Sequence, residues 1–105
     1  MPIAQKTLCL ALTSTLTTNL LTAGANETIR ITHITVAAST TAGAITLSKV
    51  DTSASITSNI FNARAISANS NLEFFDTILE PTDILRGGFT TATGSTVIID
   101  YMVET

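Results

Sequence analysis

Charge is scarce in this chain, and so are the side chains on which most enzymatic sites depend. Charged residues make up 12% of its 105 residues, against about 25% in ordinary soluble domains. There is one His, one Cys and no Trp. A single histidine excludes a histidine-rich metal site, and no serine has a predictable His base beside it. No phosphate-cradling glycine loop or nucleophile elbow occurs. We interpret the chain as non-enzymatic, with no cofactor and no small-molecule substrate.

The charge balance also argues against nucleic acid and membrane as partners. The formal net charge is -3 at pH 7, whereas binding through phosphate neutralisation needs a basic face. The longest N-terminal apolar run, Leu8 to Leu12, is shorter than a signal-peptide core of about 7–15 residues. No stretch approaches the roughly 18 apolar residues of a membrane span. The first 25 residues are therefore predicted to form two strands and not a targeting segment.

One cysteine excludes an internal disulfide framework. Cys9 stands between Leu8 and Leu10 in a predicted strand. We interpret it as a small buried hydrophobe. The alternative is an intermolecular bond between copies, which would require Cys9 to face an interface.

What the chain has in abundance is threonine, at roughly a fifth of all residues, far above ordinary usage. Threonine is β-branched and suits a half-buried pleated surface. Short apolar and hydroxyl-rich runs alternate with polar turns at regular spacing, which is the pattern of a sandwich or jelly roll. The sequence therefore predicts one all-β domain over residues 1–105, an antiparallel β-sandwich of about eight strands. The strands are expected near 5–12, 16–22, 28–37, 43–50, 55–66, 71–76, 83–90 and 95–104.

Two strands carry a change of apolar phase, and four segments are predicted turns. In the third strand, Ile29 and Ile31 are out of phase with Ile34 and Val36, which predicts a β-bulge at Thr32–His33. In the last strand, Ile98 is expected to point inward, with a one-residue phase change before Tyr101 and Val103. The predicted turns are SANSN, EPTD, RGG and TATGS.

The few acidic and imidazole groups have structural interpretations. Asp76, Glu80 and Asp83 gather around the EPTD corner, where carboxylates could ligate calcium. The alternating pattern of a calcium loop is absent, so we predict turn capping by Asp83 instead. Asp51-Thr52-Ser53 has the signature of an Asx or ST turn. His33 is interpreted as a packed or surface residue of the bulge.

The low charge favours a chain that is partly covered by copies of itself or by a partner, because a solvated monomer usually carries more charge. The alternative is a stable small domain whose hydroxyls keep it soluble. Candidate interface residues are the phenylalanines Phe61, Phe74, Phe75 and Phe89. Phe74 and Phe75 are adjacent in a strand and must point to opposite faces, so one of them leaves the core. It then contacts a partner or is covered by a loop of the same chain.

Most of the chain resembles a class of small virion proteins encoded by tailed bacteriophages. The similarity lies in the order of its strands and corners. The segments that carry it are Ile31, Ile34 and Val36, then Ala44–Ser48, Ile66–Ala68, Leu72–Phe75, the corner Leu79–Leu85 and the closing strand Val97–Glu104.

The resemblance implies a β-sandwich that decorates a phage particle. A capsid decoration or cement protein would bind the major capsid protein and its own copies, with a homotrimer at local threefold positions as the expected geometry. A neck or tail accessory protein is an alternative within the same class of particle. A carbohydrate-binding host-recognition module is the alternative from another class, although the chain lacks the Trp platforms that sugars favour.

Overall fold

The computed structural model describes residues 3–91 and 94–105, and in them the chain is all-β. Its eight strands are β1 (Ile3–Ala11), β2 (Asn19–Thr22), β3 (Thr28–Ala37), β4 (Gly43–Asp51), β5 (Ile56–Ile66), β6 (Asn71–Leu79), β7 (Ile84–Phe89) and β8 (Thr96–Glu104). Within the described ranges, no helix is long and apolar enough to cross a membrane. The prediction of an eight-stranded β-sandwich is confirmed.

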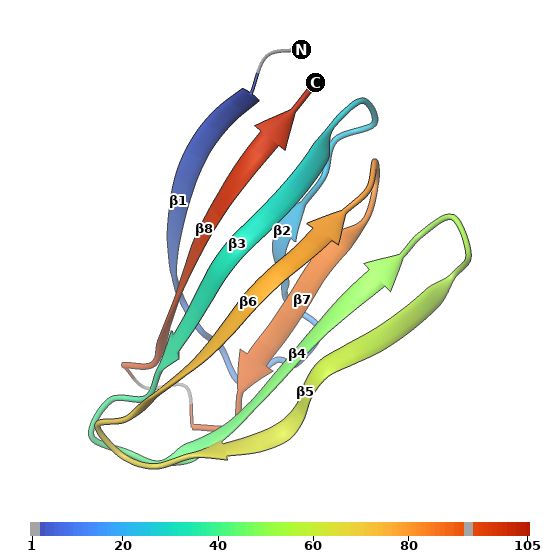
Figure 1. The fold of residues 1–105 in the computed structure, drawn as a ribbon. Coiled ribbons are helices and arrows are strands. Elements are labelled where there is room, and N and C mark those ends of the chain that lie inside the picture. Colours follow the sequence, from blue (N-terminus) through green and yellow to red (C-terminus); the bar gives the residue numbers. More distant parts are fainter. Residues whose placement is uncertain (1–2, 92–93) are drawn as a thin grey trace.

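The strands form two packed four-stranded antiparallel sheets (Figure 1). Sheet A has the order β1-β8-β3-β6, and sheet B has the order β2-β7-β4-β5. The first strand thus pairs with the last, the second with the seventh, the third with the sixth and the fourth with the fifth. This is a long antiparallel ribbon rolled up on itself, which is the jelly-roll connectivity.

In most strands alternate residues fill the space between the sheets, whereas β5 is exposed along most of its length. The fully buried side chains include Ile31, Ile34 and Val36 of sheet A and Ile45, Leu47 and Leu85 of sheet B. The last strand corrects one prediction. Val97, Ile99, Tyr101 and Val103 follow one unbroken period, and Ile98 is exposed. The inward side chains of β8 therefore alternate without interruption, and its pairing with β1 has no register shift.

The predicted bulge in β3 is confirmed. The register of β3 with β8 shifts between Ile31 and His33, so Thr32 is the extra residue. The register between β3 and β6 does not shift, because β6 has a residue, Asp76, opposite Thr32. Asp76 has a φ of 66°, in the left-handed region that a non-glycine residue adopts at some cost. The bulge lets Ile29 and Ile31 share the core with Ile34 and Val36.

The predicted RGG turn is wrong, since Arg86, Gly87 and Gly88 lie inside β7. Glycine is required there by close approach of backbone from neighbouring segments. A Cβ at Gly87 would lie 2.5 Å from the carbonyl oxygen of Thr46, and one at Gly88 would lie 2.5 Å from that of Thr15. The glycines thus permit tight packing and do not reverse the chain.

Two strand boundaries differ by three residues from those predicted, and the other boundaries agree within two residues. β2 begins at Asn19 and not at residue 16, because the backbone N–H and side-chain hydroxyl of Thr18 both donate to the carbonyl of Thr15 in a turn. β6 continues past Asp76 to Leu79, since pairing with β3 resumes after the bulge. Ala92 and Thr93 of the predicted TATGS turn lie outside the described residues.

Candidate functional site

The outer face of sheet A presents side chains from all four of its strands. Directly opposite residues of an antiparallel sheet point to the same side, so the registers of the four strands define rows of outward side chains. From β1 across to β6 the three central rows are Cys9–Ile98–Thr35–Glu73, Thr7–Asp100–His33–Phe75 and Gln5–Met102–Arg30–Ile78.

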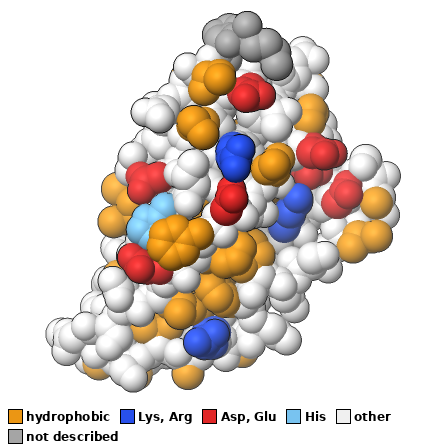
Figure 2. Space-filling view, viewed as in Figure 1, with side chains coloured by type: hydrophobic (Ala, Val, Ile, Leu, Met, Phe, Trp, Pro, Cys, Tyr) orange, Lys and Arg blue, Asp and Glu red, His pale blue; other side chains and the backbone are white. Residues whose placement is uncertain are grey.

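Large apolar side chains stand exposed in these rows. Phe75 is 61% exposed, Ile78 is 44% exposed and Ile98 is 39% exposed. Figure 2 views this side of the molecule and shows orange apolar side chains beside the histidine and among acidic and basic groups. Scattered apolar residues are normal on a protein surface. Here three of them share one face of one sheet, and we take this face as the candidate site.

Side-chain contacts centred on His33 link all four strands of sheet A. Its imidazole stacks on the ring of Phe75, with centroids 4.7 Å apart and planes 12° from parallel. Its Nε2 lies 3.3 Å from Glu73 Oε1, and its Nδ1 lies 3.7 Å from Asp100 Oδ2. The hydroxyl of Thr7 donates to Asp100 Oδ1 at 2.8 Å. The surface around Phe75 is therefore held in one arrangement.

The acidic groups of this cluster surround His33 without converging on a position for a metal ion. The two carboxylates approach opposite nitrogens of the same imidazole, so the three groups do not converge on a single point. Among the described residues, no group of three His, Cys, Asp or Glu side chains is arranged to hold a metal ion. The neighbouring Arg30–Asp76 ion pair, at 3.4 Å, is solvent-exposed and contributes little because water screens it.

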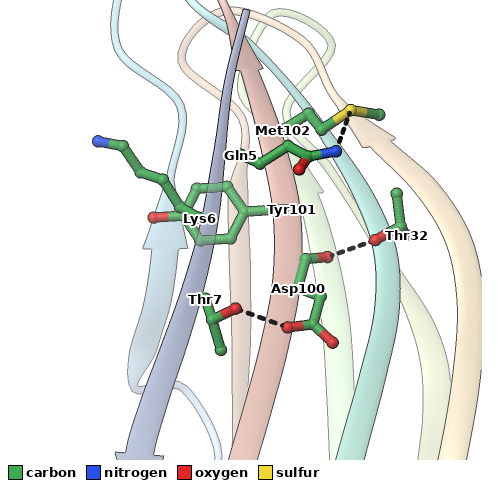
Figure 3. Close-up of a pocket in the computed structure, with 7 residues that line it drawn as sticks. All are labelled: Gln5, Lys6, Thr7, Thr32, Asp100, Tyr101 and Met102. Carbon is green, nitrogen blue, oxygen red and sulfur yellow. Dashed lines mark hydrogen bonds between the residues drawn. The ribbon is translucent and has the colours of Figure 1, made fainter.

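A shallow depression lies where β1 meets β8 (Figure 3). The residues that line it belong to both faces of the sheet, because Lys6 and Tyr101 point to the side opposite from Thr7 and Asp100. Two of its hydroxyls have partners within the chain: that of Thr32 donates to the carbonyl of Asp100 at 3.0 Å, and that of Thr7 donates to the Asp100 carboxylate at 2.8 Å. We assign no ligand to this depression.

The four predicted interface phenylalanines have different surroundings. Phe75 is on the outer face, and Phe74 points inward, as their adjacency requires. Phe74 and Phe61 are partly buried against the core and meet edge to face, with centroids 5.8 Å apart. Phe89 is fully buried, so its prediction as a contact is wrong. Its ring packs close to Gly43, where a Cβ would lie 2.5 Å from Phe89 Cε2.

Sequence reasoning missed two apolar residues of the outer face, Ile78 and Ile98. Ile98 was expected to point inward, and Ile78 follows the bulge at Asp76, where simple alternation fails. Cys9 is also corrected: it is exposed, on the same face as Ile98, and is not a buried hydrophobe. The reason is that Leu8 and Leu10 take the inward phase of β1.

The acidic turns have the structural roles that the sequence predicts. Asp83 is buried, and its Oδ2 accepts a bond from the backbone N–H of Glu80 at 3.1 Å. At the β4–β5 turn, Asp51 Oδ1 accepts bonds from the hydroxyl and N–H of Ser53 and from the N–H of Ala54. The Ser53 hydroxyl, followed by the Ala54 N–H, lowers the pKa of the Asp51 carboxyl below its ordinary 3.8.

Comparisons with protein-family models, with curated proteins and with solved structures found no match for this chain.

Proposed function

We propose that this chain is a non-enzymatic structural protein of a bacteriophage virion. Its proposed role is that of a decoration or cement protein on the capsid surface, bridging neighbouring major capsid subunits and resisting the pressure of packaged DNA. The starting point is the resemblance of its strand order to small virion proteins of tailed phages. Jelly rolls occur in viral capsid proteins but also in lectins and cupins, so the fold alone assigns no function.

The observation that carries the proposal is the outer face of sheet A. Phe75, Ile78 and Ile98 are exposed together on it, and the His33 contacts hold the largest of them in place. A preorganised apolar surface loses less side-chain entropy on binding. A cement protein needs such contacts repeated by the symmetry of a lattice. Self-association as a homotrimer at local threefold positions is part of the proposal.

The first test is the copy number of the chain in purified virions of the phage that encodes it, measured by quantitative mass spectrometry against the major capsid protein. Near-stoichiometric abundance supports lattice-wide decoration. A few to some dozens of copies would indicate a neck or tail protein instead. Absence from particles would overturn the virion proposal and favour a soluble binding module.

A second test uses matched variants in particles assembled without the native chain. Phe75→Asp changes the outer face of sheet A, and Ile56→Asp makes the same kind of change on β5 of the other sheet, where Ile56 is 56% exposed. We expect Phe75→Asp to weaken particle binding by about tenfold or more, a loss of roughly 1.4 kcal/mol, and Ile56→Asp to bind normally. Equal binding by both variants would contradict a contact through sheet A.

A further inference from the structure

The free edge of β1 is a second exposed feature that the proposed function leaves unexplained. We infer that it pairs antiparallel with β1 of a second copy about a two-fold axis at Thr7, which joins two copies of sheet A into one eight-stranded sheet. The inference does not depend on whether the chain is a virion protein.

The backbone of β1 has hydrogen-bonding groups that point away from β8. The N–H of Leu12 donates to the carbonyl of Ser95 at 3.0 Å, and the β1–β8 register continues without a shift to Ile3 and Glu104. In an antiparallel pair the bonded residues alternate. Even-numbered residues therefore bond to β8, and odd-numbered residues such as Gln5, Thr7 and Cys9 direct their N–H and C=O groups to the free edge.

The other three sheet edges carry features that hinder strand addition. β2 has only four residues. β5 has two register shifts against β4 and a left-handed residue, Ala63, with φ 52°. β6 has the left-handed residue Asp76 opposite the bulge of β3, and the charged Glu73. Across its nine described residues, β1 has no register shift, no positive φ and one charge, that of Lys6.

Full overlap of two β1 strands fixes the register. Pairing Ile3 with Ala11 of the second copy uses all nine residues and sets Thr7 opposite Thr7. Lys6 then faces Leu8, and no like charges are directly opposite. If each strand shifted by one residue, Lys6 could lie opposite Lys6 of the second copy. Two like charges directly opposite would destabilise that pairing. Lys6 therefore disfavours that competing register.

A second copy is the occupant that the described residues favour. A strand that adds to this edge must itself be extended, regular, uncharged along most of its length and free on one side. Among the described segments, β1 alone meets these conditions. A central Thr–Thr pair is one of the stabilising cross-strand contacts. The joined sheet would also set the two outer faces of sheet A side by side.

The pair has two-fold symmetry and differs from the homotrimer proposed above. The β1 pair and the homotrimer can both occur only if β1 edges link neighbouring trimers. The oligomeric mass of the purified full-length chain therefore tests the β1 pair, whereas the virion copy number tests the proposed function, and either can fail alone.

The first experiment measures that mass by sedimentation or light scattering. We expect a dimer, or a dimer of larger units, that Thr7→Lys weakens by about tenfold or more, because two lysines would then be directly opposite. Ser58→Lys adds the same charge to the exposed edge strand β5 and is expected to leave the mass unchanged. Circular dichroism confirms that both variants fold.

A second experiment tests the register by cross-linking. In a Cys9→Ser background, Thr7→Cys would set two thiols opposite each other in a bonded pair, with Cα atoms about 5.5 Å apart. That separation suits a disulfide, so mild oxidation should give covalent dimers, and Ser58→Cys in the same background should not. A monomeric chain, a mass that Thr7→Lys leaves unchanged, or equal cross-linking at both positions would each overturn the inference.

Discussion

At the scale of residues, Phe75 and His33 act as one unit. The phenyl ring is more than half exposed, yet it stacks on an imidazole that is flanked by Glu73 and Asp100. Freezing a free side chain at an interface costs about 0.5–1.5 kcal/mol. Because this ring is already restrained in the free protein, it loses less conformational entropy when a partner binds.

Asp51 offers a residue-scale prediction about pH. The hydroxyl of Ser53 is the largest cause of the lowered Asp51 pKa. Ser53→Ala should therefore raise that pKa toward 3.8, as measured by NMR titration of the carboxyl carbon. Ser58→Ala, on the neighbouring strand but without a bond to Asp51, is the control. An Asp51 pKa that stays low in Ser53→Ala would contradict the assignment.

The same shift predicts the direction of a stability change. The folded-state pKa of Asp51 is depressed, so its ionised form favours the folded state above the unfolded pKa, and this contribution is lost as pH falls through the folded pKa. We expect the melting-temperature difference between wild type and Asp51→Asn to shrink on acidification below about pH 4. The difference should be small, because the turn is open to solvent.

At the scale of elements, β6 shows how a strand divides two identical side chains between core and surface. Phe74 packs inward against Phe61, and Phe75 points outward. Phe74→Ala should lower the free energy of unfolding by about 2–3 kcal/mol, somewhat less than a fully buried phenylalanine. Phe75→Ala should cost about 0.5 kcal/mol, as is usual for exposed positions. Urea denaturation of both variants measures the difference.

Phe89→Ala should lower the free energy of unfolding more than either Phe74→Ala or Phe75→Ala. Its ring is fully buried, and we expect a loss of about 3–5 kcal/mol. If Phe75→Ala destabilised the monomer as much as Phe74→Ala, the assignment of Phe75 to an outer contact surface would be wrong.

At the scale of the whole molecule, the rolled ribbon brings the two ends of the sequence together. Ile3 pairs with Glu104 across β1 and β8, and the ends lie side by side in Figure 1. The turn between β4 and β5 lies at the far end of the ribbon, and its residues are exposed.

This connectivity predicts tolerance of circular permutation. A chain opened between Thr52 and Ser53, with residue 105 joined to residue 1 by a short glycine linker, should retain the all-β fold, because no strand pairing is cut. Its refolding rate should change little, because the β1–β8 pairing becomes local while the β4–β5 pairing becomes non-local. Circular dichroism and stopped-flow refolding provide the readouts. Loss of cooperative unfolding would show that the covalent turn is essential.

Much of this fold follows from local sequence pattern. Strand positions, the bulge at Thr32 and the turns capped by Asp51 and Asp83 were predictable, because apolar alternation and turn chemistry act over a few residues. The candidate surface was predictable only in part. Adjacency identified one outward phenylalanine of the pair Phe74–Phe75, but not which of the two.

The sequence by itself determined that the chain is an all-β sandwich with little charge. Composition and alternation suffice for that, because they decide which residues leave water. Only the tertiary structure decided which residues meet: that Phe89 is buried, that Cys9 and Ile98 are exposed, that His33 joins four strands, and that β1 is left as a regular free edge. These features depend on pairings between strands distant in sequence, such as β1 with β8, and local pattern contains no information about such partners.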